Sequence, residues 1–77
     1  MNKIKFTNVG IYGDVDGKVI KHKDDRVTVQ KPFVKWVQNS GTLAFRKIVF
    51  TGVQARELMS YLADGNNYAA VAICEAE

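Results

Sequence analysis

The sequence predicts a small, mostly β protein of the α+β class, a five-stranded barrel with one helix between strands four and five. Three observations carry this prediction. Residues 3–50 consist of short alternating runs separated by turn signals, residues 55–62 have helical periodicity, and residues 68–74 are an apolar run after a helix stop. A helix between two strands, after a β-meander, is how a small barrel closes one end. The 77 residues are enough for one domain.

The N-terminal segment predicts a half-buried strand over residues 3–9, with Ile4 and Phe6 on one face. Gly10 and Gly13 follow, and they predict a bulge or a sharp bend of the kind that small barrels need. Asp16-Gly17 is a two-residue hairpin signal, so a second strand is expected over residues 18–23.

The middle of the chain predicts two further strands. A turn at Asp24-Asp25 precedes a third strand, which begins over residues 26–30. Pro32 has no N–H to donate to a ladder, so it places this segment at a sheet edge or a bulge. The strand resumes over residues 33–38 and ends at a turn over residues 39–41, and the fourth strand covers residues 43–50.

The C-terminal third predicts the helix and the last strand. Thr51 and Gln54 fit a capping box, so the helix is expected to begin at Gly52. A buried stripe at the i, i+3, i+4, i+7 spacing consists of Ala55, Leu58, Met59 and Leu62. Gly65 is a helix stop, and residues 68–74 are the expected fifth strand.

Residue types exclude most catalytic chemistry. Cys74 is the single cysteine and is expected to be a small buried hydrophobe, and His22 is the single histidine, expected on a solvated strand. No metal site, nucleophile–base pair or cofactor motif is predicted, and turn chemistry explains the Asp residues, so we expect no enzyme. Without a disulfide framework, an apolar span or a signal core, we expect a soluble cytoplasmic protein.

The charge of +3 is unevenly distributed along the chain. Residues 1–50 carry ten Lys/Arg against four Asp, whereas residues 51–77 carry one Arg against four acids. A one-sided basic surface is typical of proteins that bind polyanions. Ordinary surface lysines on half-exposed strands explain the same charge, so charge alone leaves both interpretations open.

Five segments are similar to parts of one known family. Asn2-Lys3-Ile4 and Asn8-Val9-Gly10 are similar to its opening, and FRKIVFTG over residues 45–52 resembles its aromatic-basic strand. Residues 55–65 resemble its helix and helix exit, and residues 68–73 resemble the strand that comes next. The family is the OB-fold single-stranded-DNA-binding proteins of bacteria, phages and plasmids. The resemblance implies a single OB-fold-like domain over residues 1–77, in which bases stack on strand aromatics while cations follow the phosphates.

The resemblance also implies site residues. Phe45 aligns with a stacking Trp of the family, Trp36 lies where another is found, and Thr51 replaces a family Phe. The candidate nucleic-acid-binding residues are Trp36, Phe45, Phe33, Lys35, Arg46, Lys47, Lys21, Lys23 and Arg26. Strand alternation does not say which face is the groove, and Trp36 and Phe45 fit a core position equally well. The chain ends at Glu77 without the family's acidic tail, as expected of a short phage- or plasmid-type member in a bacterial host cell.

Two functions follow as hypotheses. The first is non-catalytic, sequence-tolerant binding of single-stranded DNA, or of RNA, in DNA replication. The second is a protein-binding module of a phage or mobile element that inhibits a host factor. A 77-residue domain without cross-links buries little surface, so we also expect a homodimer or homotetramer.

Overall fold

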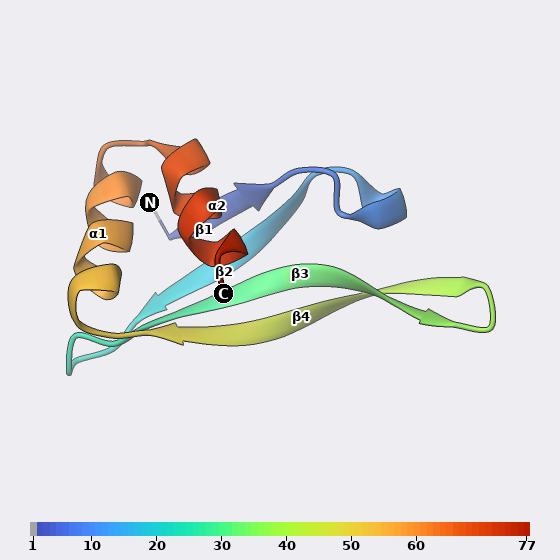
Figure 1. Cartoon of the computed structure of the whole chain (residues 1–77), viewed down its shortest axis with the longest axis horizontal. Helices are drawn as coiled ribbons and strands as arrows, with labels where there is room; N and C mark the ends of the chain where they lie inside the picture. Colours follow the sequence, from blue (N-terminus) through green and yellow to red (C-terminus); the bar gives the residue numbers. More distant parts are fainter. Residues whose placement is uncertain (1) are drawn as a thin grey trace.

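Four antiparallel strands form an open sheet in the order β1-β2-β3-β4, and two helices lie over one of its faces (Figure 1). This computed structural model describes residues 2–77, and it shows an α+β fold. The elements are β1 (Lys3–Phe6), the 3-10 helix η1 (Gly10–Tyr12), β2 (Val15–Lys21), β3 (Val27–Val37), β4 (Ser40–Phe50), α1 (Gly52–Ala63) and α2 (Asn67–Glu75). The predicted five-stranded closed barrel is wrong, because the described chain has four strands and the sheet stays open.

The expected fifth strand is the helix α2. Its N-cap is Asn66, whose side chain accepts a hydrogen bond from the Ala69 N–H at 3.2 Å. Alanine has the highest helix propensity, and the segment is rich in it. Ala70 and Cys74 lie four residues apart on one face, and both are fully buried. The run looked like a strand because a short apolar segment has no diagnostic period.

One side chain of α2 stands beside β1 where a barrel would have a neighbouring strand. The Lys5 N–H donates to Asn67 Oδ1 at 2.8 Å, and Asn67 Nδ2 donates to the Lys5 carbonyl at 2.8 Å. The amide therefore satisfies one donor and one acceptor of the β1 edge, as a paired strand residue would. Within residues 2–77, β4 is the opposite edge strand and has no strand beyond it.

The predicted hairpin turn at Asp16-Gly17 is also wrong, since both residues lie inside β2. A Cβ atom on Gly17 would lie 2.5 Å from the Phe6 ring and 2.6 Å from the Gln30 carbonyl oxygen. Glycine is therefore required here for close approach of neighbouring backbone and ring, and not for a turn. The chain reverses earlier, through η1, where Gly10 and Gly13 have φ values of 51° and 70°, and the predicted bend is confirmed.

Strand β3 continues through Pro32 without a bulge, since its pairing with β4 runs unbroken from Val27–Phe50 to Val37–Ser40. Its pairing with β2 covers only Val27 to Val29. Pro32 therefore lies where β3 has a single strand neighbour, as the edge interpretation predicted. The β3–β4 turn consists of Gln38 and Asn39, one residue earlier than expected.

Helix α1 begins at Gly52 as predicted, and Ala55, Leu58 and Leu62 are buried on its inner face. The predicted capping box is wrong, because Thr51 occupies the N-cap position but its side chain makes no capping hydrogen bond. The Gly65 N–H donates to the Leu62 carbonyl at 3.1 Å, which ends the helix as expected.

The core lies between these helices and the sheet. It contains Ile4, Phe6, Val9, Val19, Val27, Val29, Ile48, Phe50, Ala55, Leu58, Leu62, Ala70 and Cys74. Cys74 is a buried free thiol, as predicted, and burial raises its pKa from 9.0 to about 11. Within residues 2–77, neither helix has the length and apolar character needed to cross a membrane.

Candidate nucleic-acid interface

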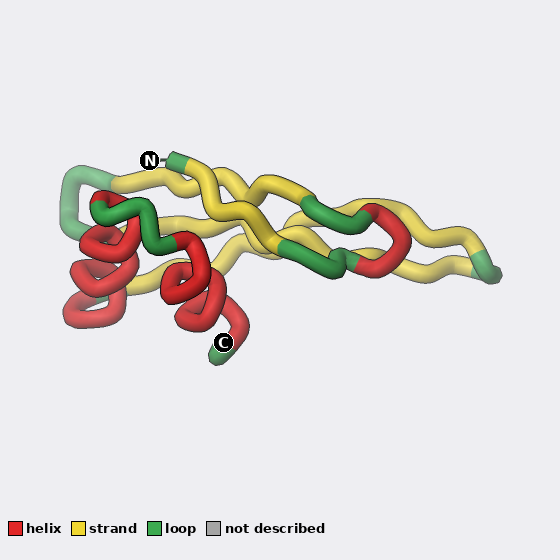
Figure 2. The backbone as a smooth tube through the Cα atoms, turned by 90° about the horizontal axis from the view of Figure 1, so that it is seen from above, coloured by secondary structure: helices red, strands yellow, loops and turns green. Residues whose placement is uncertain are grey.

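Strands β3 and β4 form a long two-stranded ribbon that extends past the helices (Figures 1 and 2). The molecule measures 40 × 22 × 19 Å, so it is elongated. We call residues 27–30 and 47–50 the proximal half of the ribbon, and residues 31–46 its distal half. The helices lie over the proximal end, whereas η1 and its loop approach the distal half (Figure 1).

In its proximal half the ribbon has an inner face toward α1 and α2 and an outer face away from them. In the distal half the outer face also carries Val34, which packs against η1 at Gly10. Val29 and Ile48 are cross-strand partners and both are buried, which identifies the inner face. Successive residues of a strand point to opposite faces, so Lys47 and Val49 belong to the outer face. Continuing this alternation along the unbroken register places Trp36 and Phe45 on the outer face and Phe33, Lys35 and Arg46 on the inner face.

Two candidate aromatics lie on the outer face. Trp36 is 58% exposed, and Phe45 is 48% exposed. The Trp36 ring lies over its cross-strand partner Gly41, where a Cβ atom would be 3.1 Å from ring carbons. Glycine therefore leaves room for the indole beside the β4 backbone. Neither aromatic belongs to the core, and each has ring surface free for stacking.

The inner face of the distal half carries a second group. Phe33 is 42% exposed, and Lys35 and Arg46 are exposed. A shallow hollow of about 320 Å³ is lined by Phe33, Arg46 and Lys31. Lys31 was not among the predicted residues, although it is the cross-strand partner of Arg46. The signal that could have found it was a strand continuous through Pro32, because Lys31, Phe33 and Lys35 then share a face.

The remaining candidates, Lys21, Lys23 and Arg26, lie at the turn between β2 and β3, at the opposite end of the ribbon from Trp36. Arg26 Nε lies 2.8 Å from Asp24 Oδ2, and its hydrogen bond holds the pKa of that carboxyl below its usual value. The nine predicted residues therefore form three groups and not one surface.

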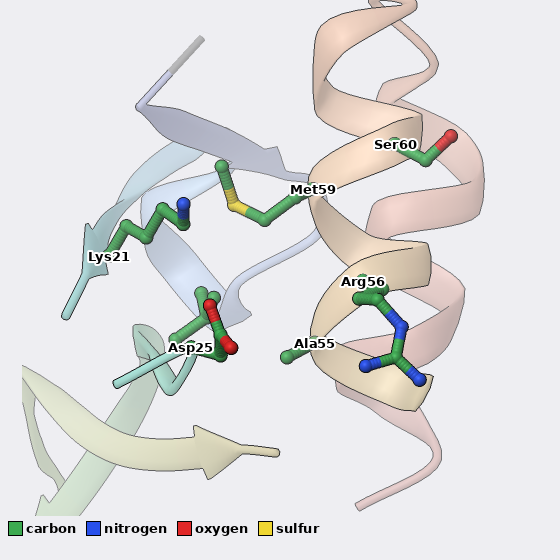
Figure 3. A pocket seen from close by; sticks show the side chains of 7 residues that line it. Lys21, Asp25, Ala55, Arg56, Met59 and Ser60 are labelled. Carbon is green, nitrogen blue, oxygen red and sulfur yellow. The ribbon is translucent and has the colours of Figure 1, made fainter. Parts of the chain in front are cut away.

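Lys21 lines a pocket of about 340 Å³ between the β2–β3 turn and α1, with Asp25, Arg56, Met59 and Ser60 among its other lining residues. Lys21 and Met59 extend toward one another across it (Figure 3). The pocket combines both signs of charge with an apolar wall. Such a lining favours neither a polyanion nor a defined reaction, so we do not assign it a function.

His22 is accounted for by its contacts, because its Nε2 lies 2.8 Å from the hydroxyl of buried Thr28. It is half-buried and not a solvated strand residue as the sequence suggested. Within residues 2–77 no three His, Cys, Asp or Glu side chains gather as metal ligands would.

The ribbon is uniformly cationic. Residues 27–50 contain Lys31, Lys35, Arg46 and Lys47 and no Asp or Glu. Within residues 2–77 one of these four cations forms an ion pair, in which Lys31 Nζ lies 3.1 Å from Glu75 Oε2 of α2. Exposed aromatic rings beside cations are the side chains that sequence-tolerant binding of single strands uses.

Comparison with protein-family models, curated proteins and solved structures finds no match to this chain. The resemblance to the OB-fold single-stranded-DNA-binding family stays a prediction, and the ribbon's geometry is the basis for assigning a function.

Proposed function

We propose that the distal half of the β3–β4 ribbon, together with Lys47 at its boundary, binds single-stranded DNA without sequence preference and without catalysis. The observation that carries this proposal is the combination of three exposed aromatics, Phe33, Trp36 and Phe45, with four cations and no acid on one ribbon. Every base has a π-face, so stacking on such rings tolerates any sequence. RNA offers the same bases and phosphates and is a second ligand of the same class.

The two ligand parts would be recognised by different side chains. Bases unstacked from one another lie against Trp36 and Phe45 on the outer face. Lys47 is two residues from Phe45 on the same face, within reach of the phosphate attached to such a base. Phosphate contacts release counterions and make the affinity fall with salt.

The direct test is a titration of the protein with oligo-dT, followed by Trp36 fluorescence, since Trp36 is the single tryptophan. We expect quenching that saturates, with log affinity falling linearly with log salt by about 0.7 per phosphate contacted. The same sequence as a duplex is the matched control, because paired bases cannot stack on protein rings. Equal affinity for the duplex, or no quenching at about 50 mM salt, would refute the proposal.

The alternative, a protein-binding module that inhibits a host factor, uses the same exposed surface. It becomes the better hypothesis if oligo-dT fails to bind while the protein is folded. The role in phage or plasmid DNA replication that the resemblance implies is part of the first proposal.

We also propose that the protein is a homodimer or homotetramer. The Asn67 amide already occupies part of the β1 edge, which leaves the 11-residue strand β4 as the edge for a second copy. Sedimentation at micromolar concentration tests this, and a folded monodisperse monomer would refute it.

A further inference from the structure

The hollow on the inner face is built around two cations that face one another. Lys31 and Arg46 are direct cross-strand partners, so their Cβ atoms are about 5 Å apart. Like charges in this position destabilise a sheet unless an anion lies between or beside them. The two side chains are therefore suited to hold one oxyanion that accepts hydrogen bonds from both of them.

An aromatic ring completes the hollow. Phe33 lies two residues from Lys31 on the same face, and its ring is 42% exposed. Its cross-strand partner is Ala44, a small residue that leaves the ring uncovered on that side. A planar apolar group attached to an anion could then lie on Phe33 while the anion meets the two cations.

A carboxylate of the chain already occupies one side of this site. Glu75, in the last turn of α2, places Oε2 at 3.1 Å from Lys31 Nζ, and the Lys31 side chain is 23% exposed. Within residues 2–77, no carboxylate forms an ion pair with the Arg46 guanidinium. Glu75 thus neutralises half of the cation pair and leaves the other half free.

We propose that Lys31, Arg46 and Phe33 bind one nucleotide unit, with its phosphate between the cations and its base on the ring, and that Glu75 competes with this phosphate for Lys31. The inference deepens the proposed function, on which it rests for the identity of the ligand. It adds a site and a built-in competitor: an incoming phosphate must displace the carboxylate, so nucleotide affinity is lower than the cations alone would allow.

The test uses thymidine 5′-monophosphate and the full chain, followed by NMR. We expect shifts at Phe33 and at the Arg46 guanidinium. Glu75→Gln should tighten binding by about two- to fivefold, the range for losing one exposed ion-pair competitor. Glu77→Gln removes the same charge two residues away and is the matched control, for which we expect a smaller gain.

Lys31→Gln should weaken mononucleotide binding and should remove the gain from Glu75→Gln in the double variant. Equal gains in the two glutamate variants, or a gain that persists without Lys31, would overturn the competition. Arg46→Gln, at an exposed position, is a second variant that should weaken binding without disturbing the core.

The site and the proposed function fail separately. If oligo-dT quenches Trp36 while the mononucleotide leaves Phe33 and Arg46 unshifted, this site is refuted and the proposed function stands. If oligo-dT does not bind but the mononucleotide shifts these residues and responds to Glu75→Gln, the site stands and the proposed function is refuted. If neither oligo-dT nor the mononucleotide binds, both the site and the proposed function are refuted.

Discussion

The two halves of the β3–β4 ribbon have the same backbone and different surroundings. In the proximal half Val29, Ile48 and Phe50 are almost fully buried beneath the helices. In the distal half the large aromatic residues Phe33 and Trp36 keep 42% and 58% of their surface exposed. The register is continuous through both halves, so strand pairing does not cause this difference.

What differs is the cover that each half receives. Helices α1 and α2 lie over the proximal end, and the distal half projects beyond them (Figure 1). Burying an aromatic side chain stabilises a fold by about 1.5–3 kcal/mol, and the distal aromatics, which are 42–58% exposed, forgo roughly half of that gain. Their exposure on a protruding cationic ribbon is the observation on which the proposed ligand binding rests.

The largest expected difference between the two halves is in stability, and a pair of Phe→Ala variants on β4 tests it. Phe50→Ala should lower the free energy of unfolding by about 3–5 kcal/mol, because it removes a ring that is 1% exposed and leaves a cavity. Phe45→Ala, five residues away and 48% exposed, should change it by about 1 kcal/mol or less. Urea unfolding measures both, and similar losses would show that the distal half belongs to the core.

Much of the fold follows from local sequence signals. Helix α1, its buried stripe and its stop at Gly65 were predicted, because periodicity and glycine chemistry act within a few residues. The Asp16-Gly17 prediction failed because Gly17 is required by Phe6 and by the Gln30 backbone, which are distant in the sequence. Likewise, α2 was mistaken for a strand because its partner, the β1 edge, lies 62 residues from Asn67.

The candidate site was predictable in composition but not in arrangement. Phe33, Trp36 and Phe45 were named from the sequence, and the structure exposes all three. Alternation along the sequence could not identify the buried face of β4, because both of its faces mix apolar and basic residues. The burial of Ile48 in the structure identifies that face. Glu75 could not be paired with Lys31 while residues 68–74 were expected to be a strand.

A chemical test of the covered half uses Cys74. Its pKa is raised to about 11 from 9.0 because burial disfavours the thiolate. A group with a raised folded-state pKa contributes its full stability below the unfolded pKa, near pH 9, and loses it as the pH rises toward 11. Two units correspond to about 2–3 kcal/mol.

The measurement is urea unfolding at about pH 8 and about pH 10.5, for the wild type and for Cys74→Ala. The two proteins differ in this one side chain, so the difference between their losses of stability isolates the thiol. We expect the wild type to lose more stability than the variant. Parallel losses would mean that Cys74 is not desolvated in the folded state.

The same comparison predicts the opposite pattern for Trp36 in the distal half. Trp36→Ala should weaken oligo-dT binding by about 1–3 kcal/mol, the value of one stacked base. Its free energy of unfolding should change little, because more than half of the residue is already in water. Because this variant has no tryptophan, its binding is measured by the fluorescence anisotropy of a labelled oligonucleotide. If Trp36→Ala loses its folded structure as well as its DNA binding, Trp36 is a structural residue and the stacking role is refuted.

The smallest effect separates the two ends of the ribbon by charge. Lys35 lies in the distal half near Trp36, whereas Lys23 lies in the turn between β2 and β3 at the proximal end. Both lysines are exposed, so substitution by Gln should change stability within about 0.5 kcal/mol in each case. If the DNA path is confined to the distal half, Lys35→Gln removes a phosphate contact and lowers the salt slope by about 0.7, while Lys23→Gln leaves it unchanged. Equal reductions would extend the path along the whole ribbon to the turn. No reduction from Lys35→Gln would confine the phosphate contacts to the outer face beside Lys47.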